Sequence, residues 1–455
     1  MKAIYKEDKS LDEKAMNYGL SEDVLLENAG IALALLIKKE ARKKQKQTGK
    51  KSRILFLLGG GNNGADGLVA LRHLKRCKAY KLGFNENANF KKQERILKNY
   101  GFKFLQKKPR FQNYDFIIDC ILGTGIQRNL EESTVEILHK VNRSDAIKIA
   151  CDIPTALGQK LCFKADITLC MGVYKELVLQ DFAKDYVGKL YLANLGIKHK
   201  YFACDAKTFL LEKKDLQTLQ RKQNSHKGTF GHIYIAGSAS AGTLAGLGAL
   251  HFGAGLVSLV APQSFSPLLM LKKDLSSQAN AIALGMGLEN LELLQSEILK
   301  NIPLVLDANC FLSKNILLYL DREDVVITPH PKEFLRLWRL CFNETLTIDQ
   351  LQKERFFYAR EFTKQYQCIL VLKGANTLIA YKDKIFVVNL GNSALAKGGS
   401  GDVLSGMIAT LLAAGFKACK AAKNAVLAHA LVAKNYKANP NSFTALKLVK
   451  GLQCL

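Results

Sequence analysis

Short apolar stretches recur along this chain, and each ends in a loop of small or acidic residues before a stretch with helical spacing. The first is residues 53–61 (RILFLLGGG), and residues 114–125 (YDFIIDCILGTG) and 147–158 (IKIACDIPTALG) repeat the arrangement. Strands that alternate with helices form mainly parallel sheets. In such sheets the ligand site lies beyond the carboxyl ends of the strands. We therefore predict an α/β fold with its functional residues in these loops.

The alternation runs through the chain in two series. The second series begins with residues 231–238 (GHIYIAGS), after a polar stretch at residues 210–228. A chain of 455 residues is too long for one ordinary core and fits two domains. We predict a Rossmann-like three-layer α/β/α domain over residues 1–204 and a second α/β/α domain over residues 205–455.

Composition narrows the class of partner. The formal charge of +26 suits an anionic small molecule or nucleic acid, but the only dense basic run, residues 38–53, has no interleaved aromatic residues. We therefore do not expect nucleic-acid binding.

The 11 cysteines form no CxxC pair, which favours reduced thiols. No apolar run approaches the roughly 20 residues of a membrane span, and the start lacks a signal-peptide core. We predict a cytoplasmic protein with no membrane partner.

A glycine-rich motif near the end of the chain predicts phosphoryl chemistry. Residues 396–406 (AKGGSGDVLSG) place four glycines around Asp402, just before the apolar stretch 407–416. Backbone amides of Gly399, Ser400 and Gly401 at a helix N-terminus can hold phosphoryl oxygens. An aspartate there would repel a phosphate unless it faced the attacking hydroxyl. We therefore predict that Asp402 is the general base of a phosphoryl transfer.

The loops of the first half carry polar residues at three strand ends. Residues 59–67 (GGGNNGADG) form a glycine turn that matches neither a dinucleotide fingerprint nor a phosphate-binding loop, because the lysine is missing. Asn and Asp in such a turn can also serve turn and cap geometry alone. Asp119, Asp152 and Thr155 end neighbouring strands, which brings hard oxygen ligands to one crevice. This set suits a cation together with an anionic ligand.

Several motifs together resemble those of the bifunctional NAD(P)H-hydrate repair enzymes. The epimerase domain of that family is resembled by residues 24–30 (VLLENAG), 59–67, 119–126 (DCILGTGI), 152–158 (DIPTALG) and 165–175 (ADITLCMGVYK). Its dehydratase domain, which is ribokinase-like, is resembled by residues 226–238 (HKGTFGHIYIAGS), 253–260 (GAGLVSLV), 328–334 (TPHPKEF), 372–377 (LKGANT) and 391–406. Each set stands in the family's order.

This resemblance implies a metabolite-repair enzyme. Its substrates would be NADHX and NADPHX, whose R and S forms the first domain would interconvert. The second domain would dehydrate the S form with ADP or ATP through a phosphorylated intermediate. The resemblance also implies bound K⁺, and we expect Mg²⁺ with the nucleotide and a homo-oligomer. Epimerisation needs a carboxylate to carry the proton, and we leave this role open between Asp152 and Asp119, since no histidine lies in these loops.

The resemblance also implies the site residues. The epimerase substrate site would comprise Asn62, Asn63, Gly64, Ala65, Asp66, Gly123, Thr124, Gly125, Ile126, Gln127, Arg128, Asn129 and Asp152, with K⁺ at Asn63, Asp119 and Thr155. The dehydratase would contact the hydrate through Ala241, Gly287, His330 and Asp402, and the nucleotide through Lys373, Gly374, Ala375, Asn376, Thr377 and Gly401. Ala65 and Ala156 replace usual glycines, and residues 285–289 (GMGLE) depart from the family pattern. Lys397 either adds charge near the nucleotide or is solvated.

Two other function classes stay open on the sequence. A ribokinase-like fold also serves kinases of vitamin precursors and sugars, which would release a stable phosphoester. Alternatively, the first half is a binding scaffold with a degenerate site, or the whole chain binds nucleic acid. The retained Asn63, Asp66, Asp119 and Asp152 argue against degeneracy.

Overall fold

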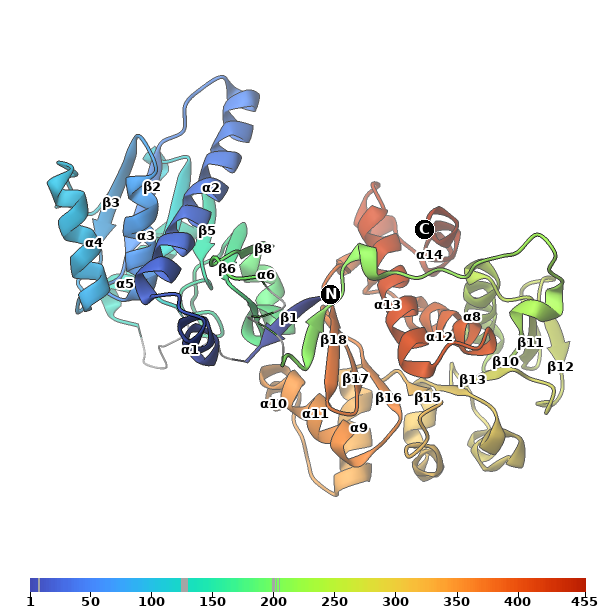
Figure 1. Cartoon of the computed structure of the whole chain (residues 1–455). Coiled ribbons are helices and arrows are strands. Elements are labelled where there is room, and N and C mark those ends of the chain that lie inside the picture. The colour runs from blue at the N-terminus through green and yellow to red at the C-terminus, as the bar shows by residue number, and fades with distance from the viewer. Residues whose placement is uncertain (7–8, 124–129, 199–200, 202, 204) are drawn as a thin grey trace. The chain divides into compact units, whose positions relative to one another are not determined.

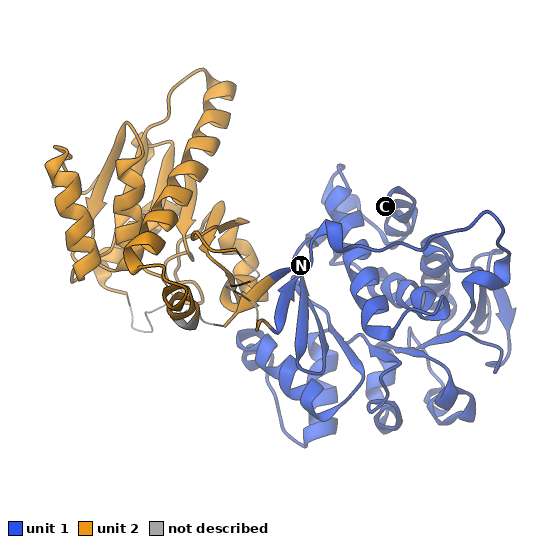
Figure 2. Cartoon of the chain, in the orientation of Figure 1, with its two compact units in different colours: residues 1–2, 207–455 blue, residues 3–206 orange. Residues whose placement is uncertain are grey.

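The computed structural model describes all residues of the chain except 7–8, 124–129, 199–200, 202 and 204 (Figure 1). The chain divides into two compact units, residues 3–206 and residues 1–2 together with 207–455 (Figure 2). Each has a mainly parallel sheet covered by helices, so the predicted α/β fold class is confirmed. Within the described ranges, no helix has the length and apolarity needed to cross a membrane.

The smaller unit is built on a six-stranded sheet in the order β3-β2-β4-β5-β6-β8, and all neighbours in it are parallel. The strands are β2 (Ile54–Leu58), β3 (Cys77–Lys81), β4 (Phe116–Cys120), β5 (Ile147–Cys151), β6 (Ile167–Met171) and β8 (Lys189–Ala193). The helices are α1 (Lys9–Asn17), α2 (Glu22–Thr48), α3 (Asn62–Arg72), α4 (Ala88–Asn99), α5 (Glu132–Asn142) and α6 (Lys184–Val187). A further parallel pair, which is not part of this six-stranded sheet, joins β1 (Lys2–Tyr5) to β7 (Tyr174–Lys175).

Helices cover both faces of this sheet. Phe56 and Leu58 of β2 pack into a core with α2 and α3, whereas Leu55 and Leu57 of the same strand pack into a core with α5. Successive side chains of a strand point to opposite faces, so a strand covered on both sides must be apolar throughout. This explains why the strands read as short continuous apolar runs.

The larger unit has the strand order β12-β11-β10-β13-β14-β15-β16-β17-β18-β9. Only β17 of these strands is antiparallel to its neighbours, because the chain turns back after β16 through residues 373–376. The strands are β9 (Thr208–Leu210), β10 (His232–Ala236), β11 (Leu256–Val260), β12 (Met270–Lys272), β13 (Ala281–Leu284), β14 (Leu304–Leu306), β15 (Val325–Ile327), β16 (Ile369–Leu372), β17 (Thr377–Tyr381) and β18 (Lys384–Val388).

Two groups of helices cover this second sheet. The helices are α8 (Ala239–Phe252), α9 (Pro331–Phe342), α10 (Ile348–Lys353), α11 (Arg355–Gln365), α12 (Ser400–Ala413), α13 (Ala418–Asn435) and α14 (Ala445–Gly451). The first group, α8 with α12, α13 and α14, shares one apolar core with the sheet. The second group, which includes α9 and α11, lies on the opposite face (Figure 1).

Glycines allow α8 and α12 to approach closely. A Cβ atom built on Gly406 of α12 would lie 1.9 Å from the Ala245 carbonyl oxygen, and one on Gly248 of α8 would lie 2.7 Å from the Val403 carbonyl oxygen. The two backbones therefore touch where the side chains are missing. This contact fixes α12, whose N-terminus carries the glycine-rich motif.

We predict that Gly406→Ala destabilises the larger unit. Alanine improves intrinsic helix propensity by about 1 kcal/mol, but its Cβ forces the helices apart, and overpacking of a core costs ~1–3 kcal/mol or more. A thermal melt should show a Tm several degrees lower for Gly406→Ala. Gly398→Ala is the control, because a Cβ atom there meets no atom within 4 Å. An unchanged Tm for Gly406→Ala would contradict the close approach of α8 and α12.

Candidate active sites

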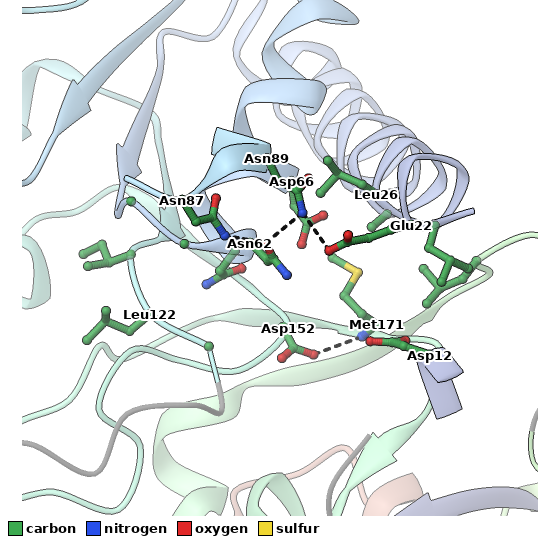
Figure 3. A pocket seen from close by; sticks show the side chains of 18 of the residues that line it. Asp12, Glu22, Leu26, Asn62, Asp66, Asn87, Asn89, Leu122, Asp152 and Met171 are labelled. Carbon is green, nitrogen blue, oxygen red and sulfur yellow. Dashed lines mark hydrogen bonds between the residues drawn. The ribbon is translucent and has the colours of Figure 1, made fainter. Parts of the chain in front are cut away.

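A cavity of about 680 Å³ lies in the smaller unit at the carboxyl ends of its central strands (Figure 3). The loop after β2 and the start of α3 contribute Asn62, Asn63 and Asp66 to its lining. Gly123 follows β4 and Asp152 follows β5, and both also line it. The parallel order of β2, β4 and β5 brings these residues together, because it gathers their carboxyl ends at one edge.

Two other expected substrate residues, Gly64 and Ala65, do not line the cavity. Gly64 and Ala65 are buried in the first turn of α3, where a Cβ atom on Gly64 would lie 2.0 Å from the Gly59 carbonyl oxygen. Ala65 donates its amide to the Gly61 carbonyl at 3.0 Å, so the alanine that replaces a usual glycine fits the helix. The residues expected at 124–129 (Thr124, Gly125, Ile126, Gln127, Arg128 and Asn129) lie outside the described residues.

Asp119 joins the loops after β4 and β5 from inside the protein. It is fully buried, and it accepts hydrogen bonds from the Thr155 amide at 2.7 Å, the Thr155 hydroxyl at 2.6 Å and the Ile121 amide at 3.1 Å. Burial raises the pKa of Asp119 to about 6, and the hydrogen bonds from Thr155 and Ile121 oppose this rise. Asp119 does not line the cavity, and its hydrogen bonds tie the loops after β4 and β5 together.

Asn63 has a buried amide group that the protein leaves without a partner. Neither its side-chain oxygen nor its side-chain nitrogen makes a hydrogen bond within the described structure. An unsatisfied buried polar group is costly, and such groups often mark a ligand or ion position. The structure brings together Asp119 and Thr155 of the expected K⁺ set, and it places Asn63 on the wall of the cavity.

Asp152 is held by a buried lysine. Its Oδ2 pairs with the Lys175 ammonium, and its Oδ1 accepts a hydrogen bond from the Met171 amide at 3.3 Å. Lys175, on β7, is fully buried. The backbone of Asp152 is left-handed, with a φ of 69°, which is unusual for a residue other than glycine and is common at functional sites.

Our sequence analysis missed one wall of this cavity. The Asn87 side chain donates to the Asn62 side-chain oxygen at 2.6 Å, and Asn89 donates to the same oxygen at 3.2 Å and to Glu22 at 2.7 Å (Figure 3). The signal was available, because residues 85–89 (NENAN) follow β3 at the same edge of the sheet. Asp12 of α1 also lines the cavity, and nothing in its local sequence marks it.

In the larger unit, Asp402 lies in the first turn of α12, whose N-cap is Gly399 with a left-handed φ of 86°. Lys373, from the loop after β16, donates to Asp307 Oδ1 at 2.9 Å, and its ammonium lies 3.3 Å from a Cβ position on Gly401. Burial and then the charge of Asp307 raise the pKa of Asp402 to about 6, while Lys373 lowers it. The structure therefore gathers a cation and two carboxylates at the mouth of α12.

Asp307, at the end of β14, is a residue that the sequence analysis did not single out. It is 1% exposed and accepts a hydrogen bond from the Ser405 hydroxyl at 2.8 Å. Burial opposes its ionisation, but the Lys373 ammonium and the hydrogen bonds outweigh burial and hold the pKa of Asp307 below its usual value. An aspartate at a strand end was the available signal.

The expected hydrate contacts lie at neighbouring strand ends and helix starts. Gly287, with a φ of 66°, packs on Ser238, and a Cβ atom on Gly287 would lie 2.6 Å from the Ser238 hydroxyl. Ser238 caps α8 and accepts a hydrogen bond from the Ala241 amide at 3.2 Å. His330 caps α9 by accepting from the Glu333 amide at 3.2 Å, and its own amide donates to Glu333 at 2.7 Å.

Lys397 is tied to a neighbouring turn. Its ammonium donates to the Asn441 carbonyl, and the side chain is exposed. His429 supports the first turn of α12 from below, since its Nε2 lies 3.1 Å from the Ser400 hydroxyl and 3.0 Å from the Ser400 carbonyl. Burial lowers the pKa of His429 to about 4, so the ring is neutral at pH 7.

A fully buried arginine fixes the expected nucleotide loop. Arg355, at the start of α11, donates to the carbonyls of Leu372 at 3.1 Å, Lys373 at 3.1 Å and Asn376 at 2.9 Å. Lys373, Gly374, Ala375 and Asn376 form this loop, and Thr377 begins β17. The planar fork of a guanidinium group suits several carbonyls at once. Sequence reasoning missed Arg355, because nothing in its local sequence links it to a loop 17 residues further on.

Family models match both halves of the chain, and curated relatives match nearly all of it. A family model described as YjeF-related protein N-terminus matches residues 22–177, and one described as NAD(P)H-hydrate dehydratase matches residues 233–453. The chain is 36% identical to the bifunctional NAD(P)H-hydrate repair enzyme Nnr of Helicobacter pylori over 100% of both chains. It is 30% identical to the protein of the same name from Coxiella burnetii, with 93% of this chain and 92% of that one covered.

Solved structures resemble the larger unit. An ADP/ATP-dependent NAD(P)H-hydrate dehydratase from Bacillus subtilis, co-crystallised with ATP and Mg²⁺, is 32% identical and has a TM-score of 0.45. The match covers 52% of this chain and 92% of that one. A ribokinase-like superfamily protein from Enterococcus faecalis is 24% identical with a TM-score of 0.47, and that match covers 55% of this chain and 95% of that one.

We predict that Arg355→Met destabilises the larger unit and loosens the loop at residues 373–376. Each buried carbonyl left without a donor costs about 1–3 kcal/mol, so the Tm should fall by several degrees. ADP and ATP should bind more weakly in calorimetry even below the lowered Tm. Arg336→Met, at an exposed position on α9, is the control. A variant that kept both its Tm and its nucleotide affinity would rule out the role of Arg355.

Proposed function

The chain belongs to the family of bifunctional NAD(P)H-hydrate repair enzymes, and we propose that residues 1–204 catalyse epimerisation and residues 205–455 dehydration of NADHX and NADPHX. The match over the full length of the Helicobacter pylori relative carries this proposal. The presence of one candidate site in each compact unit supports the division. The cytoplasmic location and the homo-oligomeric state stay predictions.

We assign the epimerase reaction to the cavity of the smaller unit. In the hydrates a hydroxyl group sits on a carbon next to the ring nitrogen. The nitrogen lone pair expels the protonated hydroxyl as water and leaves an iminium ion, to which water returns from either face. Asp152 faces the cavity, whereas the oxygens of Asp119 are bonded inside the protein. Asp152 therefore exchanges the proton, and Asp119 holds the loops around it.

We assign K⁺ to Asn63, Asp119 and Thr155. The unsatisfied buried amide of Asn63 supports this assignment, as does the hard oxygen character of all three side chains. When bound, the ion would supply a fixed positive charge near the anionic parts of the substrate. The residues of the chain fit this ion without a change of ligand type.

We assign the dehydratase reaction to the mouth of α12. The hydroxyl oxygen of the S hydrate attacks the terminal phosphorus of ADP or ATP, the bridging P–O bond breaks, and Asp402 accepts the hydroxyl proton. Amides of Gly399, Ser400 and Gly401 stabilise the phosphoryl oxygens. The new ester leaves as phosphate when the ring nitrogen forms a C=N bond, and loss of a proton from the adjacent carbon restores NAD(P)H.

Two further elements complete the dehydratase site. Lys373 lies between Asp307 and Gly401, where its charge faces the transferred group. Mg²⁺ would arrive with the nucleotide, since the described residues contain no group of three or more His, Cys, Asp or Glu suited to a metal. Mg²⁺ in such sites is commonly held by one or two carboxylates and the phosphates.

We predict that Asp402→Asn abolishes dehydration and spares epimerisation. Loss of a general base lowers the rate by about 100- to 10,000-fold. Return of NADH absorbance from NADHX with ADP or ATP measures dehydration, and chiral chromatography measures epimerisation. In the wild-type protein dehydration should also fall as the pH drops through about 6, because protonated Asp402 cannot accept a proton.

Asp274→Asn, at an exposed position of the same unit, is the matched control for Asp402→Asn. Dehydration by Asp402→Asn at the control rate would remove Asp402 from the mechanism. A stable phosphoester in place of free phosphate would identify the larger unit as a kinase instead.

We predict that Asp119→Ala slows epimerisation by about 10- to 100-fold, as expected when a residue that orders a site is lost. Addition of K⁺ should raise the Tm of the wild-type protein and leave that of the variant unchanged. Asp145→Ala, exposed in the same unit, is the control. Normal epimerisation by Asp119→Ala in K⁺-free buffer would contradict the ion assignment.

A further inference from the structure

Two carboxylates reach the epimerase cavity in opposite surroundings. Asp152 pairs with the fully buried Lys175 ammonium and accepts a hydrogen bond from the Met171 amide. Asp66, from α3, is 9% exposed, and no donor among the described residues bonds to its carboxyl group. Both line the cavity, and Figure 3 draws Asp66 above and Asp152 below its interior.

The buried lysine decides which of the two is charged. A buried ammonium is tolerated only beside a negative charge, so Lys175 requires Asp152 as a carboxylate. The left-handed backbone at Asp152, with a φ of 69°, aims this carboxylate at Lys175 and the Met171 amide. A second negative charge on Asp66 would then have no ion-pair partner among the described residues in the same buried space.

The groups that face Asp66 support this division. Burial and then the charge of Asp152 raise the pKa of Asp66 well above its usual value, Lys175 lowers it, and Asp12 raises it further. Glu22 also lines the cavity and accepts from Asn89, which adds negative charge and no cation. These surroundings favour the protonated form of Asp66.

We propose that Asp66 as a carboxylic acid and Asp152 as a carboxylate form an acid–base pair on two walls of the epimerase cavity, and that Lys175 is the positioning residue that holds Asp152 as the carboxylate. This inference rests on the proposed epimerase function. It adds two residues to the mechanism, since Asp66 was expected only to contact the substrate and Lys175 was assigned no role.

The pair accounts for both steps of the reaction. Asp66 gives its proton to the substrate hydroxyl, the C–O bond breaks, and the ring nitrogen lone pair forms the C=N bond as water leaves. A water on the opposite face attacks the same carbon and gives its proton to Asp152, while the C=N electron pair returns to nitrogen. Asp66 is then a carboxylate and Asp152 a carboxylic acid. A return of that proton from Asp152 to Asp66 through water resets it for the next turnover.

The first test replaces the carboxyl group of Asp66 with an amide of nearly the same shape. Asp66→Asn in the full chain should slow equilibration of R and S NADHX by about 100- to 10,000-fold, with the dehydratase rate unchanged. Asp145→Asn, exposed in the same unit, is the control. A wild-type protein that does not equilibrate the two forms would overturn the proposed function and this pair with it. A wild-type protein that does so, with Asp66→Asn within threefold of it, would overturn the pair alone.

The second test distinguishes a role of Lys175 in positioning Asp152 from a role in stabilising the fold. Lys175→Met removes the positive charge that faces the Asp152 carboxylate, so the acidic limb of the epimerase pH–rate profile should move to higher pH by one unit or more. The double variant Lys175→Met/Asp152→Asn, which removes both members of the ion pair, should regain the wild-type Tm if the single variant folds poorly, and should stay inactive. An equal loss of rate at every pH in Lys175→Met would show that Lys175 serves only the fold.

Discussion

Both units depend on a parallel sheet that is covered by helices on both faces. Neither face of such a sheet is open to solvent. Ligands therefore bind in the loops that follow the carboxyl ends of the strands. In the smaller unit this edge carries Asn63, Asp66 and Asp152, and in the larger unit it carries Asp307 and Lys373. The interior of each unit is apolar, so every polar side chain at this edge must find a partner or a ligand.

The two units provide partners for these polar side chains through the same arrangement of charges. Each pairs a lysine with a buried aspartate: the fully buried Lys175 with Asp152 in one, and the partly buried Lys373 with Asp307 in the other. Each then places a further aspartate near the pair, and the paired carboxylate together with burial raises the pKa of that aspartate. The pKa of Asp402 rises to about 6, and we assign Asp402 the role of base, whereas the pKa of Asp66 rises well above its usual value, and we assign Asp66 the role of acid.

Positioning in both sites comes from residues that never face the ligand. Asp119 joins two loops through three hydrogen bonds, and Arg355 holds another loop through three carbonyls. The close contact of α8 and α12 fixes the helix that carries Asp402. A site on loops gains precision when its supports are buried and rigid, and these three supports are fully buried or backbone contacts.

The sequence by itself determined the α/β class, the strand ends and the side chains that stand on them. Apolar runs that end in glycine or aspartate predicted the sheets, and Asp402, Asp119 and Asp152 were found because local pattern marks a strand end or a helix start. Only the tertiary structure decided that Lys175, Asp307, Arg355 and the asparagines after β3 belong to the same sites. Such contacts join residues far apart in the chain, so they depend on strand order and side-chain direction, which no local pattern encodes. The raised pKa of Asp66 is decided at the same level, because it follows from burial and from the charges that the fold places around it.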